Sequence, residues 1–205
     1  MRRIITIARD FGAGGSTLGR HLAEDLGIEY YDREILSLAA KESGFCAEVF
    51  EKNDEKNRFL RTLGNIIPFI GGGTTYYSNE LSNENLFRIQ SEAIRKAAAD
   101  HSCIFIGRCA DYVLRDYPRC VNVFITADMK DRIANVMKWS NCSAEKAEEI
   151  IEKGDSQRAD FYNFYSSGTW GAASTYHLCI NSSVLGIEVT AAFIKEFILK
   201  KLGEK

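Results

Sequence analysis

The chain has 205 residues, which is enough for one enzyme-sized domain with a substantial apolar core. Its 26 Lys and Arg residues nearly balance its 28 Asp and Glu residues, so there is no general basic field of the kind that holds a nucleic acid polymer. Any site for an anion must therefore be local.

The N-terminal segment and the cysteines bear on the cellular compartment. The short apolar run at residues 4–8 lacks the apolar core and the small-residue cleavage site of a signal peptide, and no stretch reads as a membrane span. The six cysteines are scattered, without a C-x-x-C pair or a His at ligand spacing, so we expect neither a zinc site nor a disulfide framework. These features predict a cytoplasmic protein that associates with no membrane.

Apolar runs alternate along the chain with segments of helical period. The runs predict buried strands at residues 4–8, 28–31, 103–106, 120–125 and 176–180. Helical periodicity predicts helices at residues 18–26, 34–41, 84–99, 130–138 and 188–202. This alternation predicts a parallel sheet covered on both faces, with ligands bound at the carboxyl ends of the strands.

Two segments interrupt the alternation. Residues 59–79 are rich in glycine and also apolar, which is typical of a mobile flap or an oligomer arm. Residues 143–174 are charged and aromatic, and they read as an excursion between the fourth and fifth strands. Within this excursion we predict a helix over residues 145–153, then a turn bracketed by Lys153, Asp155 and Arg158, and a second helix as far as residue 165.

The loop after the first strand has the form of a phosphate-binding loop with altered chemistry. On the pattern G-x-x-x-x-G-K-[ST], residues 9–16 keep the second glycine, Gly14, and the hydroxyl of Ser16. Arg9 stands in the place of the first glycine, and Gly15 in the place of the lysine. The loop is either a cradle for phosphates or an ordinary turn whose glycines allow close helix packing.

The cradle interpretation rests on the backbone. Gly12, Gly14 and Gly15 allow a tight turn that aims successive N–H groups at an anion, and Ser16 or Thr17 is expected to cap the following helix. The absent lysine would have neutralised charge on a transferred phosphoryl group, so another cation must replace it. Arg9 is the nearest candidate, and Arg20, one helical turn further along, is the second.

Several stretches resemble bacterial cytidylate kinases. They are "GAGGSTLGRHLAEDLG" at residues 12–27, "FIGRCADYVL" at 105–114, "VFITADMKDRIANVM" at 123–137, and the Asp155-x-x-Arg158 pattern. In this ordered combination the chain resembles the cytidylate kinase-like family over nearly every element except residues 46–81. The resemblance implies an α/β, three-layer P-loop kinase fold with a five-stranded parallel sheet and helices on both faces. It also implies a single domain over residues 1–205, with an acceptor flap at about 46–81 and a lid at about 143–174.

The resemblance implies transfer of the γ-phosphoryl group of ATP to a nucleoside monophosphate, with Mg²⁺. Such a reaction needs cations placed around the phosphates and water kept out. We therefore assign the catalytic charges to Arg9, Arg108 and Arg158. The donor and its metal ion are expected to contact Gly12, Ala13, Gly14, Gly15, Ser16, Thr17, Arg132 and Asn181, with Ser16 and Thr17 as the metal-binding hydroxyls. The acceptor is expected to contact Asp32, Arg33, Arg108, Asp111, Lys153 and Asp155.

Most of these residues also have a structural interpretation. Arg108 either holds the acceptor phosphate through two parallel bonds or pairs at the surface with Asp111 or Asp116. Ile106 and Cys109 replace the acidic residues that flank this arginine in cytidylate kinases, which argues against recognition of cytosine.

Further alternatives concern residues on the helices. Asp32 either accepts from an acceptor hydroxyl or caps the next helix, and its neighbour Arg33 meets an anion or only solvates a helix face. Arg132 is either a second phosphate contact or half of an ion pair on a helix surface. Asn181 either contacts the adenine of the donor or bonds within its own turn. The aromatic side chains either stack on a base or anchor the lid: Phe161, Tyr162, Phe164, Tyr165 and Trp170.

Two other functions remain open at this stage. Gly15 in the lysine position also fits a regulator that binds nucleotide without transferring phosphate. The acceptor region offers no familiar pattern, so a kinase of a non-nucleotide metabolite is the third hypothesis. The apolar run at residues 66–70 could dock a second copy of the chain to form a homodimer.

Overall fold

The computed structural model describes residues 2–32 and 83–204, and its centre is a parallel sheet of five strands. The strands are β1 (Ile4–Arg9), β2 (Glu29–Tyr31), β3 (Cys103–Ile106), β4 (Cys120–Thr126) and β5 (Leu178–Asn181). Their order across the sheet is β2-β3-β1-β4-β5. Ile7 pairs with Ile106 of β3 and Val123 of β4, so β1 is central and the carboxyl ends of the three strands lie at one edge. The predicted fold class is confirmed.

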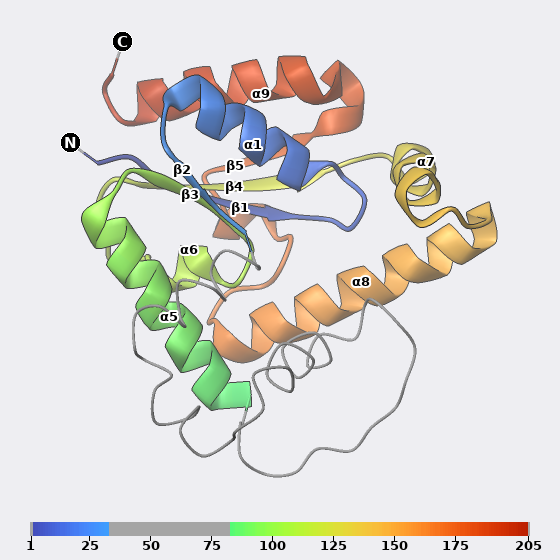
Figure 1. Cartoon of the computed structure of the whole chain (residues 1–205), viewed down its shortest axis with the longest axis horizontal. Helices are drawn as coiled ribbons and strands as arrows, with labels where there is room; N and C mark the ends of the chain where they lie inside the picture. Colours follow the sequence, from blue (N-terminus) through green and yellow to red (C-terminus); the bar gives the residue numbers. More distant parts are fainter. Residues whose placement is uncertain (1, 33–82, 205) are drawn as a thin grey trace, which may run out of the picture.

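Helices cover both faces of the sheet (Figure 1). One face carries α1 (Gly15–Leu26) and α9 (Ser182–Lys201); the other carries α5 (Asn83–Asp100) and the short α6 (Ala110–Val113). Because side chains alternate along a strand, Ile5 and Ile7 of β1 pack toward α1 and α9, whereas Ile4 packs with Phe105 on the opposite face. These two apolar layers hold the central strand, and with it the start of the candidate loop.

After β4 the chain forms α7 (Met129–Ser140) and α8 (Ala144–Tyr165), and a short 3-10 helix, η1 (Ala173–Thr175), follows α8. Helices α7 and α8 pack through Val136, Ala147 and Ile151, with Phe11 of the candidate loop against them. From this contact α8 runs beneath the sheet toward α5 and α6 (Figure 1). The lid candidate is therefore a long helix that passes the loop after β1.

The turn predicted near residue 155 does not exist, because α8 is one continuous helix over that region. Gly154 causes the wrong prediction, since glycine reads as a helix breaker in sequence. In the structure it serves a close contact: a Cβ on Gly154 would lie 2.5 Å from Cδ2 of Phe11. The glycine thus allows the ring of Phe11 to lie against the helix axis, and the helix continues past it.

The remaining expectations about local structure have mixed outcomes. The helix expected at residues 188–202 is present as the main part of α9, and a kink at Gly186, whose backbone is not helical, separates it from a first turn that begins at Ser182. Cys103, Cys109 and Cys120 are buried and unpaired, as expected of small apolar side chains. In the part of the chain that the structure describes, no helix is long and apolar enough to cross a bilayer. The helix expected at residues 34–41, the flap at 46–81 and the apolar run at 66–70 lie outside the described residues.

Candidate phosphate-binding site

The loop between β1 and α1 lies at the carboxyl edge of the sheet and leads directly into a helix N-terminus. Gly12 and Gly14 adopt positive φ angles of 81° and 77°, which other residues rarely adopt. Gly14 is the residue that caps α1, and among residues 2–32 and 83–204 no side chain caps this end of the helix. The expectation that Ser16 or Thr17 caps it is therefore wrong: both lie in the first turn, where they are exposed. The first N–H groups of the helix, which have no partner inside it, remain for a ligand.

Arg9 leaves β1 and crosses over the first residue of α1. Its Cβ and Cγ each lie 2.9 Å from the position that a Cβ on Gly15 would occupy. The guanidinium carbon then lies 3.4 Å from the corresponding position on Gly107, at the end of β3. Burial, together with the nearby charge of Arg108, lowers the pKa of Arg9 to about 10. Arg9 is thus a partly desolvated cation at the mouth of the loop.

The turn after β3 has an unusual backbone. Gly107, Arg108 and Cys109 follow one another with positive φ angles of 71°, 60° and 51°. The left-handed region costs a non-glycine residue about 1 kcal/mol or more, and such residues gather at functional sites. The turn carries the guanidinium of Arg108 to the face of the Phe161 ring, 5.9 Å from its centroid, and into the electrostatic reach of Arg9.

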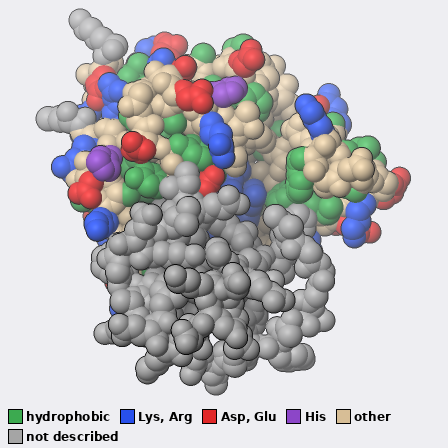
Figure 2. All heavy atoms as spheres, viewed as in Figure 1, with side chains coloured by type: hydrophobic (Ala, Val, Ile, Leu, Met, Phe, Trp, Pro, Cys, Tyr) green, Lys and Arg blue, Asp and Glu red, His purple; other side chains and the backbone are tan. Residues whose placement is uncertain are grey.

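Arg158 approaches the same loop from α8. One of its terminal nitrogens donates to the carbonyl oxygen of Arg9 at 2.8 Å, and its guanidinium carbon lies 4.8 Å from the centroid of the Phe11 ring. Burial lowers the pKa of Arg158 well below its ordinary value, and the charge of Arg9 adds to this effect. The structure therefore gathers the three arginines to which the sequence assigned catalytic charge. Figure 2 shows basic side chains where the main body meets the lobe that carries α7.

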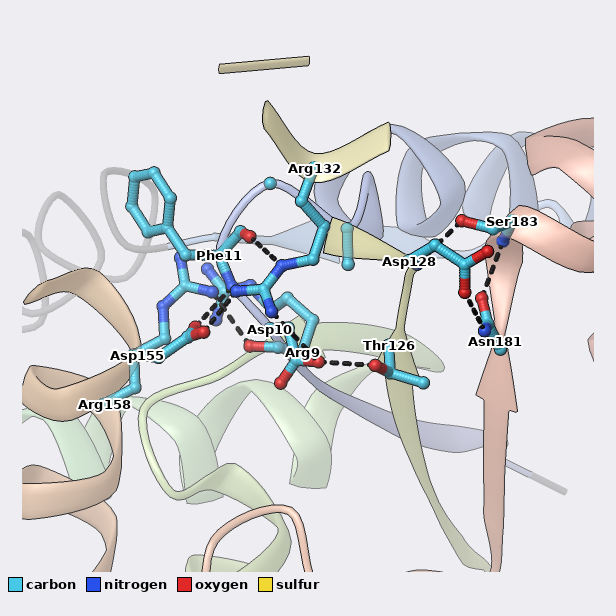
Figure 3. A network of polar contacts seen from close by, with 12 residues as sticks. Arg9, Asp10, Phe11, Thr126, Asp128, Arg132, Asp155, Arg158, Asn181 and Ser183 are labelled. Carbon is cyan, nitrogen blue, oxygen red and sulfur yellow. Dashed lines mark hydrogen bonds and ion pairs between the residues drawn. The ribbon is translucent and has the colours of Figure 1, made fainter. Parts of the chain in front are cut away.

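Arg132 has a different situation, because acceptors of the protein surround it (Figure 3). Its Nε donates to the carbonyl oxygen of Phe11 at 2.8 Å, one terminal nitrogen pairs with Asp155, and the other lies 3.8 Å from Asp10. Only 7% of the residue is exposed. Of the two interpretations of Arg132, the ion pair is the one present, although it is buried and not on a helix surface. Its charge is already neutralised by two carboxylates.

Asp155 joins α8 to the candidate loop. Besides its pair with Arg132, it accepts a hydrogen bond of 2.7 Å from the backbone N–H of Phe11. Asp155 therefore holds the first half of the loop from the side of the lid helix, which differs from the contact with an acceptor that the sequence suggested.

Sequence reasoning missed several residues that support the loop. Asp10 accepts from the hydroxyl of Thr126 at 2.5 Å, and burial raises its pKa. The amide of Asn135 donates to the carbonyl oxygen of Gly12 at 2.9 Å. Asp10 directly follows β1 and Thr126 ends the neighbouring β4, so their position at the same edge of the sheet could have predicted this contact. Asn135 lies within a helix and offered none.

The structure places Asn181 at the start of α9. Its side-chain oxygen accepts from the N–H of Ser183 at 2.9 Å, and its amide nitrogen donates to Asp128 at 2.8 Å. Ser183 in turn accepts from the N–H of Asp128 through its hydroxyl oxygen at 2.9 Å (Figure 3). Asn181 is thus a helix cap, which is the turn interpretation of this residue.

Of the other residues expected to contact the acceptor, Asp32 and Asp111 have separate partners in the protein. Asp32, after β2, lies 3.4 Å from a terminal nitrogen of Arg20. Asp111 is buried at 7% exposure and accepts from the hydroxyl of Tyr162 at 2.6 Å, so its carboxylate serves the contact between α6 and α8. Lys153 is exposed on α8. Arg33 lies outside the described residues.

The aromatic side chains of the lid pack mainly on one another and on the core. Tyr165 stacks on Phe87 of α5 with ring centroids 4.2 Å apart, and Phe161 lies 4.8 Å from Tyr165. Trp170 meets Phe124 of β4 edge to face, at 5.3 Å. These contacts favour the anchoring interpretation over stacking on a base.

A parallel sheet of this order, with a glycine loop leading from its central strand into α1, defines a protein of the P-loop kinase class. Comparison with protein families is consistent with this class: residues 4–184 match the model of the cytidylate kinase-like family, and the chain belongs to that family. A search of curated proteins finds no match.

Solved structures share the fold. A crystal structure of an uncharacterized protein from Eubacterium ventriosum ATCC 27560 is 25% identical, with a TM-score of 0.74, over 96% of this chain and 98% of that one. The shikimate kinase from Acinetobacter baumannii, in complex with shikimate, is 15% identical with a TM-score of 0.53, over 98% and 95% of the two chains. The shikimate kinase from Bacteroides thetaiotaomicron is 13% identical with a TM-score of 0.52, over 96% and 98%. At these identities the two kinases show the fold alone.

Proposed function

We propose that this protein is an ATP-dependent phosphotransferase whose acceptor is a nucleoside monophosphate or a similar small phosphate-bearing molecule. One observation carries the proposal: Arg9, Arg108 and Arg158, from three separate parts of the chain, meet at a glycine loop that opens a helix. Three cations placed together in a partly buried site repel one another, and a polyphosphate is the ligand that would relieve this repulsion.

The residues of the loop fit a polyphosphate donor and its metal ion. The free N–H groups at the start of α1 would hold the phosphate oxygens, and the exposed hydroxyls of Ser16 and Thr17 are oxygen ligands of the type that Mg²⁺ prefers. When bound, Mg²⁺ would neutralise charge on the phosphates. The protein supplies the cradle, the arginines, and the cover that α8 gives to the loop.

The reaction requires little covalent participation from the protein. The bond from the γ-phosphorus to the bridging oxygen of ATP breaks, a bond from that phosphorus to the acceptor oxygen forms, and ADP leaves. Negative charge on the transferred group is then stabilised by the guanidinium groups around it. Arg108, at the end of β3, is suited to the phosphate of the acceptor because a guanidinium can hold phosphate through two parallel bonds.

The acceptor defines the alternatives. Ile106 and Cys109 beside Arg108 offer no acidic group to a cytosine ring, so the proposal names no base. The similar shikimate kinases share only the fold, but they make a hydroxyl-bearing metabolite a reasonable second class of acceptor. A regulator that binds nucleotide without transfer is the other alternative, because Gly15 stands where the lysine would be.

A coupled assay of ADP release tests the proposal over two panels, one of nucleoside monophosphates and one of small hydroxyl-bearing metabolites, each with ATP and Mg²⁺. We expect turnover with at least one monophosphate, and an Arg108→Ala variant should lose most of it. Arg115→Ala is the matched control, because Arg115 is exposed and its contacts with described residues are to Tyr112 and Asp116, close in sequence.

Calorimetric titration with ATP and Mg²⁺ separates the remaining outcomes. Binding without turnover in either panel would favour the regulator, and turnover only with the second panel would favour the metabolite kinase. No binding of ATP at all would overturn the proposal.

A further inference from the structure

In this chain the first glycine and the lysine of the phosphate-loop pattern are exchanged: a cation stands in the glycine position and a glycine in the lysine position. The first position of the pattern is glycine, and here it is a cation, Arg9. The seventh position is lysine, and here it is a glycine, Gly15. Each substitution alone would break the pattern, so the question is whether the two changes are related in space.

The structure shows that they are. The Cβ and Cγ of Arg9 each lie 2.9 Å from the point where a side chain on Gly15 would begin, and its Cδ lies 3.5 Å from that point. The stem of Arg9 therefore fills the space into which a lysine at position 15 would have to extend. The arginine at position 9 and a lysine at position 15 therefore cannot both be accommodated unless one of the two side chains is displaced.

The guanidinium of Arg9 also has no directly bonded anion among the described residues. Within the described part of the chain its guanidinium makes no hydrogen bond and no ion pair within 4 Å; the more distant Asp32 favours its charged form only in part, because burial and Arg108 outweigh it. Arg132, by contrast, is bonded to the Phe11 carbonyl and two carboxylates, and Arg158 donates to the Arg9 carbonyl. A partly buried cation without an anion partner costs free energy, so a ligand that supplies the anion is favoured.

We propose that Arg9 is the catalytic cation of the loop: its guanidinium replaces the absent lysine on the transferred phosphoryl group, and Gly15 is the vacated position that makes room for it. This inference rests on the proposed function. The Arg9 side chain spans from the start of α1, where the donor phosphates would bind, to the turn after β3, and its guanidinium lies against Gly107, next to the Arg108 that is proposed for the acceptor. A charge in that place stabilises the group in transit more than either resting state.

A set of reciprocal variants tests the exchange. Arg9→Met keeps the length of the stem and removes the charge. Gly15→Lys restores the lysine beside Arg9, and the double variant R9G/G15K rewrites the loop as the complete pattern G-x-x-x-x-G-K-S. Arg115→Met, remote from the loop, is the matched control. Each variant is measured by calorimetric titration with ATP and Mg²⁺ and with ADP and Mg²⁺, by turnover, and by thermal unfolding without ligand.

We expect R9M to unfold at the same or a higher temperature than the wild type, because an unpaired cation has been removed, and yet to lose about tenfold or more in turnover and in affinity for ATP. Its affinity for ADP should fall less, because the proposed contact is to the transferred group. G15K should unfold at a lower temperature, since its new stem meets that of Arg9. R9G/G15K should recover both the unfolding temperature and the affinity for ATP toward the wild-type values.

Several results would overturn the inference. R9M that keeps affinity and turnover within about twofold of the wild type would show that the charge of Arg9 acts on nothing. A double variant no better than the worse single variant would show that the two positions are independent. Equal loss of ATP and ADP affinity in R9M would assign Arg9 to the cradle and not to the transferred group. If the wild type binds ATP but R9M behaves like it, only this inference fails; if the wild type binds no ATP, the proposed function fails with it.

Discussion

Replacing Asp155 with alanine should destabilise the protein by about 3 kcal/mol, since breaking a buried ion pair costs about 3–5 kcal/mol and losing a buried hydrogen bond about 1 kcal/mol more. Asp155 accepts from the N–H of Phe11 and pairs with Arg132, which is only 7% exposed. We place the total below the sum of about 4–6 kcal/mol, because the Asp155 side chain is 22% exposed and Arg132 keeps Asp10 at 3.8 Å.

The measurement is urea unfolding at pH 7, followed by circular dichroism and by tryptophan fluorescence. For a chain of this size, a loss of about 3 kcal/mol should also lower the melting temperature by about 6–12 °C. Asp155→Asn should lose less, because the neutral side chain can still accept from the N–H of Phe11. The control is Glu152→Ala on the exposed face of the same helix, where a change of less than about 0.5 kcal/mol is expected. If D155A is as mild as that control, the link between α8 and the loop contributes little to stability and the reasoning is refuted.

Three further predictions follow from other contacts. Gly154→Ala should destabilise the fold by about 1–3 kcal/mol in urea, although alanine ordinarily favours a helix, because its Cβ would lie 2.5 Å from the Phe11 ring; Ser156→Ala is the control, and a stabilised variant would contradict the contact. Burial raises the pKa of Asp111, so the folded state should gain stability as pH falls from the raised value toward 3.8; Asp111→Asn should lose this gain in urea titrations between pH 4 and 7, and an unchanged slope would exclude it. Alkylation at pH 8 with peptide mapping should label the exposed Cys179 and spare three thiols whose pKa burial raises to about 12: Cys103, Cys109 and Cys120. Rapid labelling of these three in the folded protein would count against their burial.

The architecture follows from local patterns to a large extent. The apolar runs at residues 103–106 and 120–125 differ from the observed strands by at most one residue, because strands covered on both faces form nearly continuous apolar runs. The break predicted at Gly154 is wrong for the complementary reason. A glycine that permits a helix to approach a ring has the same sequence signature as one that ends a helix, and only the position of Phe11 distinguishes them.

The glycine loop and its cations were predictable from the sequence, whereas most of the contacts that support them were not. Arg9 and Arg108 follow the carboxyl ends of neighbouring parallel strands, so their proximity follows from the order of the sheet. The bonds of Arg132 to Asp10 and Asp155 span 122 and 23 residues of sequence, and no local pattern indicates them. The cap of α1 was missed because hydroxyl residues usually hold that place, whereas here the positive φ of Gly14 does.

The packing of Arg9 over Gly15 also constrains how such a loop can change over generations. A lysine at position 15 can appear without crowding only after position 9 has become small, so the order of the two mutations matters and the tolerated intermediate has glycine at both places. That intermediate would lack a cation from either position. Stepwise exchange between the two forms of the loop that avoids crowding would therefore pass through an intermediate with no cation at either position.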